Sequence, residues 1–415
     1  MREWQVSVRD TSNVLLRVIR QVPVVGLHSV QTAKTAALVS RKLGMNPGKI
    51  MIMYLLGALH DVGLMIPSLR KEYESFPKDK GILEMIKHED LMKSHGPVGA
   101  KIVGSVPILE DFSTVVEHHH TPAYELDIDE LHVMANALNA ANMMSIKLLE
   151  HDNRGDREFF EDFESHIKSH KVEYFPDVRE AAVESAAEEA MMMLASDEDP
   201  HWDDFVGIDS SLDLSSFLSF LNLMDYLVDS MAEETQHHSA RVAFLSRELA
   251  KELLTEAESV GVYIAGRMHD LGKIYLPSEI VARRDDSDYD FHLHVIYTYK
   301  LFDCFRSFQN VVSWAVTHHE RLDGSGYPWH LKASDLSLPA RIIQVADEYV
   351  TLVERGVEDP LKVIEGMVKE GKHDKDVVEV LRGMVRNGYD VLEYYDVIDM
   401  YIREVESGGG PKDFV

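Results

Sequence analysis

The sequence predicts an all-α protein built from two tandem copies of one helical domain, and three observations lead to this prediction. Helix-forming residues dominate, runs of β-branched residues are few, and 45% of the residues are hydrophobic, as a well-buried globular chain requires. The length of 415 residues exceeds what one compact core usually holds. In addition, a set of histidine and aspartate motifs occurs twice along the chain.

The repeat consists of paired motifs in the same order. The aligned pairs are His28-Ser29 with His238-Ser239, His60-Asp61 with His269-Asp270, His95 with His294, His118-His119 with His318-His319, and Asn142 with Asp347. The offsets between the copies are 210, 209, 199, 200 and 205 residues. The offsets are nearly constant, and a change of loop length explains the one shift of ten residues, whereas the offsets of chance matches would scatter.

The repeat divides the chain into a first helical domain at residues 1–195 and a second at 214–406. Between them we expect a linker at 196–213, because seven of its 18 residues are acidic, none is basic, and a proline and a glycine interrupt any helix. The glycine-rich tail, residues 407–415, is predicted to be disordered.

Apolar periodicity predicts the helices that carry the second set of motifs. These are 235–254, 258–270, 311–319 and 340–352, with the paired histidines in the last turn of the third. A further helix over 175–194 is expected to close the first domain.

Charge and cysteine usage exclude several classes of function. With 42 basic and 71 acidic residues, the formal charge of -29 argues against duplex nucleic acid or an anionic membrane as a partner. The single cysteine, Cys304, allows neither an intrachain disulfide nor a thiolate metal cluster. The longest apolar run, 50–59, is about half a membrane span, and the N-terminus lacks a signal-peptide core. A cytoplasmic protein is therefore expected; a homodimer is compatible with the sequence, although no feature demands one.

The second copy carries a metal-ligand pattern. Glu234 and His238 are four residues apart and would share one face of a helix. The full set contains five histidines and three carboxylates: Glu234, His238, His269, Asp270, His294, His318, His319 and Asp347. So many nitrogen and oxygen ligands suit two or three octahedral iron or manganese ions rather than one tetrahedral zinc.

Such a site suits phosphodiester cleavage. Asp270 is the expected bridging carboxylate between two ions, whose activated hydroxide would attack phosphorus in line. Lys273, one turn beyond His269, is expected to bind the phosphate oxygens as a point charge. Arg241 is a second candidate for substrate binding, although pairing with a carboxylate or a capping role is equally open.

Residues 318–328 contain the most specific motif, His-His-Glu-Arg-Leu-Asp-Gly-Ser-Gly-Tyr-Pro. Gly324 and Gly326 permit a tight loop whose amides, together with Asp323, we expect to face the substrate. Tyr327 would offer a planar face to a base and a hydroxyl to a phosphate.

Residues 234–352 resemble the HD-GYP family of the HD phosphohydrolase superfamily, known as cyclic di-GMP phosphodiesterases. The resemblance rests on Glu-x-x-x-His-Ser-x-Arg-Val, His-Asp-Leu-Gly-Lys, His294, the 318–328 string and Ala-Arg-Ile-(x)4-Ala-Asp. It implies the eight metal ligands given above and, through Glu234, the subset with three metals, commonly iron or manganese. The sequence departs from the family at the usual His-Pro-x-x-Gly, here His294 to Thr298, and after Asp347, where only Arg355 offers a cation.

The first copy resembles a diverged HD domain. It retains six of the motif residues: His28, His60, Asp61, His95, His118 and His119. Asn142 stands in place of Asp347, Val24 in place of Glu234 and Leu64 in place of Lys273, and no Gly-Tyr-Pro loop follows. The alternatives for this copy are no site at all, one weakly held metal, or a regulatory site for a small ligand.

Three functions follow from the sequence. The first is hydrolysis of cyclic di-GMP to pGpG, GMP or both. The second is the same chemistry on another nucleotide or phosphate ester, which the changed segment after Asp347 favours. The third is a non-catalytic, ligand-responsive regulator, which would require loss of ligands in the second copy.

Overall fold

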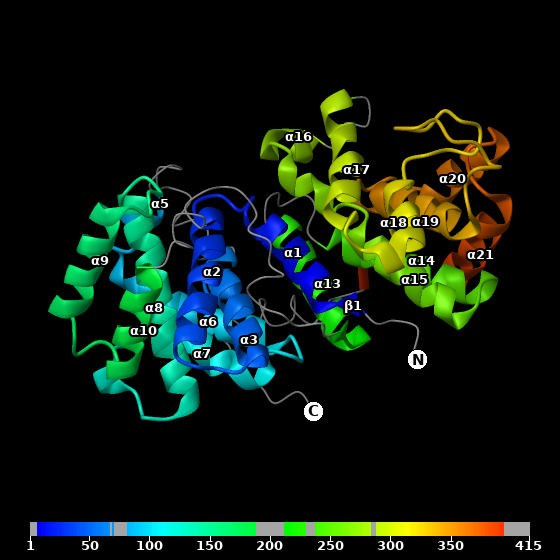
Figure 1. Ribbon diagram of the computed structural model, residues 1–415. Coiled ribbons are helices and arrows are strands. Elements are labelled where there is room, and N and C mark those ends of the chain that lie inside the picture. Colours follow the sequence, from blue (N-terminus) through cyan, green and yellow to red (C-terminus); the bar gives the residue numbers. More distant parts are fainter. Residues whose placement is uncertain are drawn as a thin grey trace. The chain divides into compact units, whose positions relative to one another are not determined.

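The computed structural model describes residues 6–66, 69, 81–187, 211–229, 237–283 and 288–393 (Figure 1). The chain divides into two compact units, with the boundary between Ser219 and Phe220. Most of the predicted linker (196–210), the predicted tail and Glu234 lie outside the described residues.

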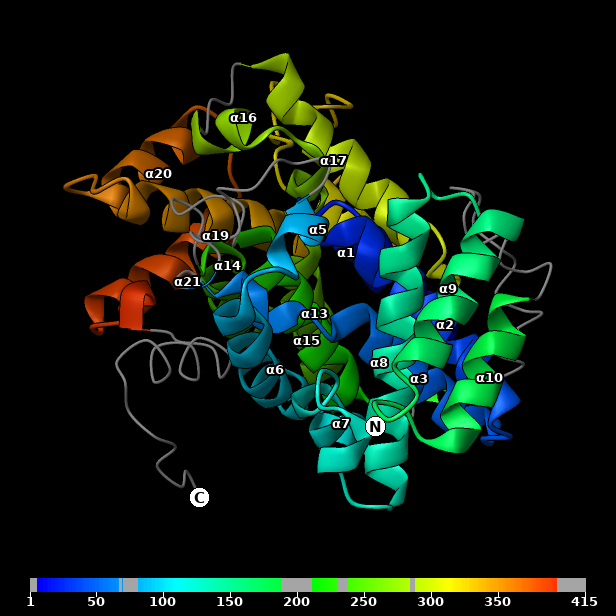
Figure 2. The same cartoon turned by 90° about the vertical axis from the view of Figure 1, so that its left-hand side faces the viewer.

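The first unit is a helical bundle. It begins with β1 (Val6–Ser7), which pairs antiparallel with β2 (Ser211–Leu212). Its helices are α1 (Val8–Ile19), α2 (Gly26–Lys42), α3 (Pro47–Leu59), α5 (Gly81–Met85), α6 (Glu89–Gly104), α7 (Ser113–Glu117), α8 (Glu130–Glu150), α9 (Arg157–Ser169) and α10 (Pro176–Ala186), with 3₁₀ turns η1 (Val62–Met65), η2 (Glu110–Phe112) and η3 (Ala123–Glu125). Helices α8 and α10 pack along α2, and α9 packs against both α8 and α10 (Figures 1 and 2).

The second unit is also helical. After α13 (Leu214–Asp229), within which the division falls, come α14 (His238–Leu253), α15 (Glu256–Met268), α16 (Ser278–Arg283), α17 (Tyr289–Phe302), α18 (Gln309–Val316), α19 (Leu338–Glu354), α20 (Pro360–Lys369) and α21 (Lys375–Arg386). The 3₁₀ turns are η5 (Leu271–Tyr275), η6 (Arg306–Phe308) and η7 (Val391–Glu393). In the described residues β1 and β2 are the only strands, so the all-α prediction is confirmed.

The two units repeat one packing scheme, which confirms the internal repeat. In the first unit α2 packs on α3 and α8, while α6 packs on α7 and η1. In the second, α14 packs on α15 and α19, while α17 packs on α18 and η5. Each unit thus brings together the helices and turns that carry its histidine and aspartate motifs.

Local sequence signals account for where the helices begin. Thr255 and Glu258 form a reciprocal capping box at the start of α15, and Asn46 caps α3 just before Pro47. Three predicted helices correspond to α14, α15 and α19 within a few residues. The fourth prediction was wrong at its end: α18 stops at Val316, so the paired histidines follow the helix instead of lying in its last turn.

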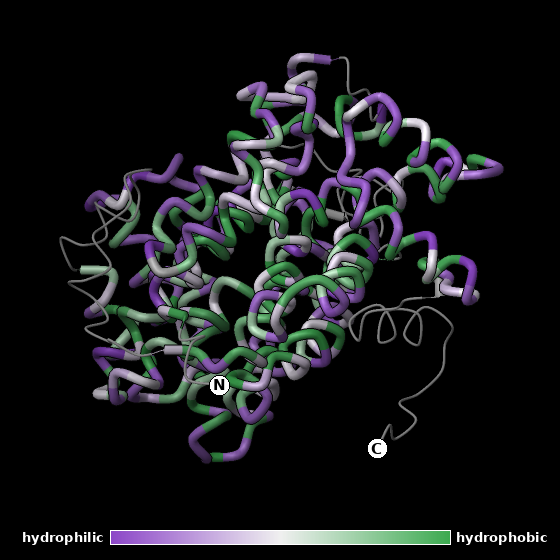
Figure 3. Tube along the Cα trace, turned by 90° about the vertical axis from the view of Figure 1, so that its right-hand side faces the viewer, coloured by the Kyte–Doolittle hydropathy of each residue, from purple (hydrophilic) through white to green (hydrophobic). Residues whose placement is uncertain are grey.

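One apolar segment, Pro47–Met65, meets the length and hydropathy test for a membrane span, but 89% of it is buried inside the protein. Burial of this kind is expected of a core helix in a bundle. Along the other helices green and purple alternate in Figure 3, as expected for amphipathic helices with one face in the core.

Candidate metal centre

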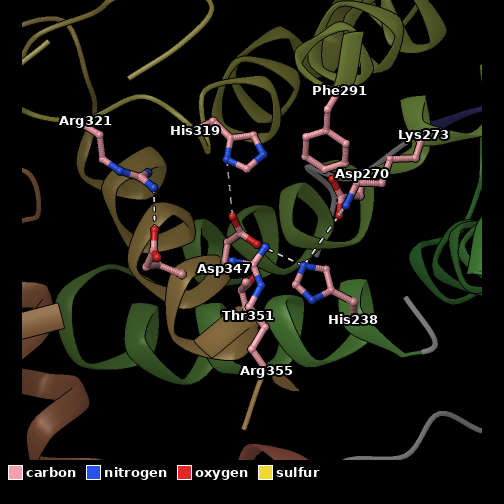
Figure 4. Close-up of a pocket in the computed structure, with 10 residues that line it drawn as sticks. His238, Asp270, Lys273, Phe291, His319, Arg321, Asp347, Thr351 and Arg355 are labelled. Atoms are coloured by element: carbon pink, nitrogen blue, oxygen red, sulfur yellow. Dashed lines mark hydrogen bonds and ion pairs between the residues drawn. The ribbon is translucent and has the colours of Figure 1, made fainter. Parts of the chain in front are cut away.

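The second unit gathers its predicted ligands from separate elements. His238 is the first residue of α14, His269 and Asp270 follow the end of α15, and His294 lies within α17. His318 and His319 follow α18, and Asp347 lies in α19. Of the eight predicted ligands the structure describes these seven and brings them together, whereas Glu234 lies outside the described residues. Figure 4 shows four of them, His238, Asp270, His319 and Asp347.

Asp270 lies at the centre, with a different pair of histidines on each carboxylate oxygen. Oδ2 is 3.1 Å from Nε2 of His269 and 3.7 Å from Nε2 of His238. Oδ1 is 3.5 Å from Nε2 of His294 and 3.8 Å from Nε2 of His318. A carboxylate that faces two ligand groups in this way has the arrangement that a bridge between two metal ions requires.

Asp347 supplies the second carboxylate. Its Oδ1 lies 3.1 Å from Nε2 of His238 and 3.8 Å from Nε2 of His269, on the same side as Oδ2 of Asp270. Its Oδ2 lies 3.9 Å from Nδ1 of His319 (Figure 4). Asp347 therefore reaches both the His238 side of the cluster and His319.

Hydrogen bonds to the outer ring nitrogens fix the orientation of the histidines. Nδ1 of His269 donates to the carbonyl of Gly266 at 2.7 Å, and Nδ1 of His318 donates to that of Ala315 at 2.6 Å. His294 makes the same bond to Phe291 at 2.5 Å. Because a carbonyl can only accept, each ring carries its proton on Nδ1 and presents the lone pair of Nε2 to the cluster.

His238 is held by a carboxylate instead of a backbone carbonyl. Its Nδ1 lies 3.0 Å from Oε2 of Glu354, and Arg241 donates to the other oxygen of Glu354 at 3.0 Å. Arg241, a candidate for substrate binding, is thus paired with a carboxylate, and its contact with substrate stays a prediction. Glu354 could not be identified from the sequence, because nothing in its spacing marks it as a neighbour of His238.

The protonation states suit metal binding. Burial alone would raise the pKa of Asp270, but His269 and Lys273 outweigh it and hold that pKa well below its usual range. For Asp347 the close contact with His238 and the nearby His319 likewise hold the pKa well below its usual range. Burial lowers the pKa of His294 to about 4. The carboxylates are therefore charged and the His294 imidazole neutral near pH 7, as metal ligands must be.

A close approach of two elements explains the glycine after His269-Asp270. A Cβ on Gly272 would lie 2.0 Å from the carbonyl oxygen of His294 and 2.4 Å from the amide of Thr298. Thr298 accepts a hydrogen bond from the Gly272 amide at 2.9 Å and donates to the carbonyl of His269 at 3.1 Å. The family that this chain resembles has glycine at the position of Thr298. Here Thr298 connects η5 to α17, the helix that carries His294.

The 318–328 loop is anchored by Glu320, which is fully buried. Its two carboxylate oxygens accept the amides of Trp329 and Leu331, each at 2.8 Å. The loop's own amides are largely used inside the chain: Ser325 donates to Asp323, and Tyr327 donates to the carbonyl of His319.

These contacts hold the loop within the chain, and its role in substrate binding stays a prediction. Asp323 is exposed and caps the turn, Gly324 has a φ of 81° and donates to the Arg321 carbonyl, and Gly326 fits against the backbone of Glu320. The Tyr327 ring stacks on His292 at 3.6 Å and on His319 at 4.6 Å between ring centroids. The ring thus contacts His319, a predicted ligand, and contact of Tyr327 with a base stays a prediction.

An open pocket of about 410 Å³, a volume that includes adjoining solvent, lies over the cluster. Its lining residues are His238, Asp270, Lys273, Phe291, His319, Arg321, Asp347, Glu348, Thr351 and Arg355 (Figure 4). Of the predicted substrate-binding residues only Lys273 lines it, paired with Asp270. Arg321, for which the sequence predicts no role, donates to Glu348 at 2.6 Å, and Arg355 supplies another cation at the pocket.

The first unit has a corresponding cluster, with one correction to its membership. The imidazole rings of His119 and His120 are 3.9 Å apart at 45°, as those of His318 and His319 are 4.0 Å apart at 46°. His118, which we paired with His318, instead lies outside and contacts Thr121 and His132. Three consecutive histidines made the alignment ambiguous by one residue, and the 199-residue offset of His95 would have resolved it.

Comparisons with known proteins agree with the repeat. Residues 25–145 and residues 222–377 each match a family model described as an HD domain. The chain is 24% identical to the 3'3'-cGAMP-specific phosphodiesterase 1 of Vibrio cholerae, over 95% of this chain and 94% of that protein. It is 29% identical to a cyclic di-GMP phosphodiesterase of Thermotoga maritima, over 44% of this chain and 51% of that protein.

A solved structure confirms the fold. The crystal structure of a cyclic GMP-AMP specific phosphodiesterase of V. cholerae superposes with a TM-score of 0.54 at 16% identity, covering 94% of this chain and all of that one. The chain therefore contains two HD domains and is a homologue of the HD-GYP-type phosphodiesterases of cyclic dinucleotides.

Proposed function

We propose that the second HD domain hydrolyses a phosphodiester bond of a cyclic dinucleotide in a metal centre bridged by Asp270. The observation that carries the proposal is the division of the Asp270 carboxylate between two groups of histidines below a pocket lined by cations. The nitrogen and oxygen ligands suit two or three iron or manganese ions, with Glu234 as a candidate for the third site. Such ions supply an activated water and offset charge on the phosphoryl group.

The chain's own residues would bind and orient the substrate. Lys273 lines the pocket beside Asp270, with its side chain only 7% exposed, and would hold a non-bridging phosphate oxygen. Arg321 and Arg355 lie in the same pocket and would bind the second phosphate or a base edge. Phe291 offers an apolar wall on which a base can rest.

Cyclic di-GMP is the substrate that the sequence motif suggests. A second candidate is 3'3'-cGAMP, because a relative named for that specificity aligns with nearly the whole chain, including both HD domains. A cytoplasmic location, where such signalling molecules would be met, belongs to the same proposal. The competing functions are hydrolysis of another phosphate ester and regulation without catalysis.

The test combines metal counting with product analysis on anaerobically purified protein. Wild type is assayed with cyclic di-GMP and 3'3'-cGAMP, and pGpG, GMP and mixed linear products are separated by chromatography. Asp270→Asn should lose at least about 100-fold in kcat/KM, because an amide cannot bridge two ions as an anion. Asp376→Asn, an exposed change on α21, is the matched control and should behave as wild type. Metal-loaded wild type that hydrolyses neither substrate would contradict the proposal.

A further inference from the structure

The first HD domain contains a buried cluster of side chains that the proposed reaction does not use. Five of its members are histidines and one is a carboxylate: His28, His60, Asp61, His95, His119 and His120. His28, His60, Asp61, His95 and His119 are at most 3% exposed. They come from α2, the end of α3, α6 and the residues after α7, which are the counterparts of the elements around Asp270.

Asp61 divides its two oxygens between histidines as Asp270 does. Oδ2 lies 3.3 Å from Nε2 of His60 and 3.8 Å from Nε2 of His28. Oδ1 lies 3.2 Å from Nε2 of His95 and 4.0 Å from Nε2 of His119. The two pairs therefore form two separate ligand groups with one shared carboxylate.

The outer nitrogens are again committed as donors. Nδ1 of His60 donates to the Gly57 carbonyl at 2.8 Å, and Nδ1 of His95 donates to the Leu91 carbonyl at 2.7 Å. His119 bonds in the same way to the Val116 carbonyl at 2.5 Å. Each of these rings consequently turns the lone pair of Nε2 inward.

The Ser145 hydroxyl fixes the orientation of the His28 ring in the same way. The Ser145 hydroxyl donates to Oε1 of Gln31 at 3.0 Å and so accepts from Nδ1 of His28 at 2.9 Å. Nε2 of His28 then faces Nε2 of His60 at 3.2 Å.

Converging acceptors of this kind need a cation. Nε2 of His95 lies 3.2 Å from Nε2 of His119, so two lone pairs face each other between fully buried rings. Nε2 of His120 lies 3.3 Å from the same nitrogen of His95. A proton on His95 would satisfy its contact with Asp61 but not the contacts within the His28 and His60 pair. Oδ2 of Asp61 and Oδ1 of Asn142 are buried and accept no hydrogen bond.

We infer that the first HD domain holds a second metal centre of its own, a pair of divalent transition-metal ions bridged by Asp61. On the Oδ2 side the ligands are His28 and His60, with the Asn142 amide oxygen beside them; on the Oδ1 side they are His95, His119 and His120. Imidazole-rich sites of this composition suit iron, manganese, nickel or zinc rather than magnesium or calcium. The inference does not depend on the proposed reaction of the second domain.

This centre is not equipped to hydrolyse a phosphodiester. The position of Lys273 is occupied by Leu64, which is fully buried, so no cation meets a phosphate. Asn142 replaces Asp347 and brings no charge. With two divalent ions, one carboxylate leaves a charge of +3, against +2 where Asp270 and Asp347 both contribute. The first centre should therefore bind its ions more weakly and attract a small anion.

Metal counting on the full-length chain tests the inference. The protein is stripped with a chelator, reloaded anaerobically with Mn²⁺, desalted, and its manganese measured per chain by mass spectrometry. We expect His95→Ala and His120→Ala to lose one or both ions of about two held by this centre. His118→Ala is the matched control, since the neighbouring ring lies outside the cluster, and it should lose none.

A second measurement separates this centre from the one in the second domain. Asp270→Asn should lose turnover and the ions of its own site but retain the first centre, visible as an exchange-coupled Mn²⁺ pair by electron paramagnetic resonance. The added change Asp61→Asn should abolish that signal. His120 is only half-buried, so His120→Ala provides a folded variant if His95→Ala unfolds in circular dichroism.

Two results would overturn the inference. One is a folded His120→Ala protein with the manganese content of wild type. The other is an Asp270→Asn protein that binds no manganese at all. Wild type that holds manganese in both domains but turns over no cyclic dinucleotide would contradict the proposed function and leave this inference standing.

Discussion

Glu354 should control the metal affinity of the second domain through the ring of His238. The carboxylate accepts from Nδ1 of His238 at 3.0 Å and is itself held by Arg241 at 3.0 Å. Only 9% of the Glu354 side chain and 14% of the Arg241 side chain are exposed, so water screens these contacts little. The informative change is Glu354→Gln, which keeps the shape and removes the charge.

The size of the expected loss in metal affinity follows from the hydrogen-bond partners of the new amide. Arg241 can only donate, so the glutamine oxygen turns toward it and the NH₂ group faces Nδ1 of His238. That nitrogen must then accept, which moves the ring proton to Nε2, the atom that faces Asp270 and Asp347. Loss of such a ring-orienting carboxylate costs about 10- to 100-fold in metal affinity or activity, or about 1.4 to 2.7 kcal/mol.

The assay is a Mn²⁺ titration of chelator-treated protein, followed by kcat/KM with the active cyclic dinucleotide at saturating metal. Glu358→Gln, an exposed change four residues further along the chain, is the matched control. Weaker metal binding together with a rise in turnover toward wild type at high Mn²⁺ would assign Glu354 a positioning role. If Glu354→Gln binds Mn²⁺ and turns over substrate as wild type does, the tautomer argument is refuted.

Three further changes test other parts of the site. Lys273→Met should lower kcat/KM by about 100-fold or more while manganese content stays at the wild-type level, because Lys273 faces the pocket and is no ligand; equal kinetics would exclude it from phosphate binding. Gly272→Ala should destabilise the fold by about 3 kcal/mol in urea titration, because its Cβ would meet backbone of α17, whereas Gly383→Ala on α21 meets open space and should be neutral or stabilising. The metal-free protein should lose stability between about pH 6.5 and 4: the pKa of His294 is lowered to about 4 in the folded state, so the unfolded state takes up more protons there, worth about 3 kcal/mol for this one residue. A urea midpoint that stays constant across that range would contradict the last prediction.

The fold was predictable because its signal is distributed along the chain. Offsets near 200 residues between matching motifs identified two copies, and apolar periodicity located α14, α15 and α19 within a few residues. The end of α18 was misplaced because His318 and His319 follow an apolar run without a stop signal such as glycine or proline. Their place beyond the helix is visible only from packing, where the ring of His318 meets that of His269.

Site residues that belong to a sequence motif could be predicted. Site residues that reach the site only through tertiary contacts could not. His269, Asp270 and Asp347 could be named from spacing, but Glu354 and Arg321 act through partners that no local pattern marks. Glu320 and Tyr327 belong to the motif, yet their contacts within the chain could not be read from it. Glu320 anchors the loop by accepting hydrogen bonds from backbone amides, and Tyr327 stacks on His319. The motif therefore identified these residues but not their contacts.

The two domains together show which parts of such a centre survive divergence. His60 and His269 each bond to the carbonyl three residues before them, which is one of the carbonyls left open at the end of a helix. The rings bonded this way keep their inward orientation even when neighbouring side chains change. His28 and His238 need a side chain from another helix, and here the copies differ, with Ser145 in one and Glu354 in the other. The two copies therefore differ in the side-chain partners and the pocket cations, while the histidines that bond to their own backbone have the same orientation in both.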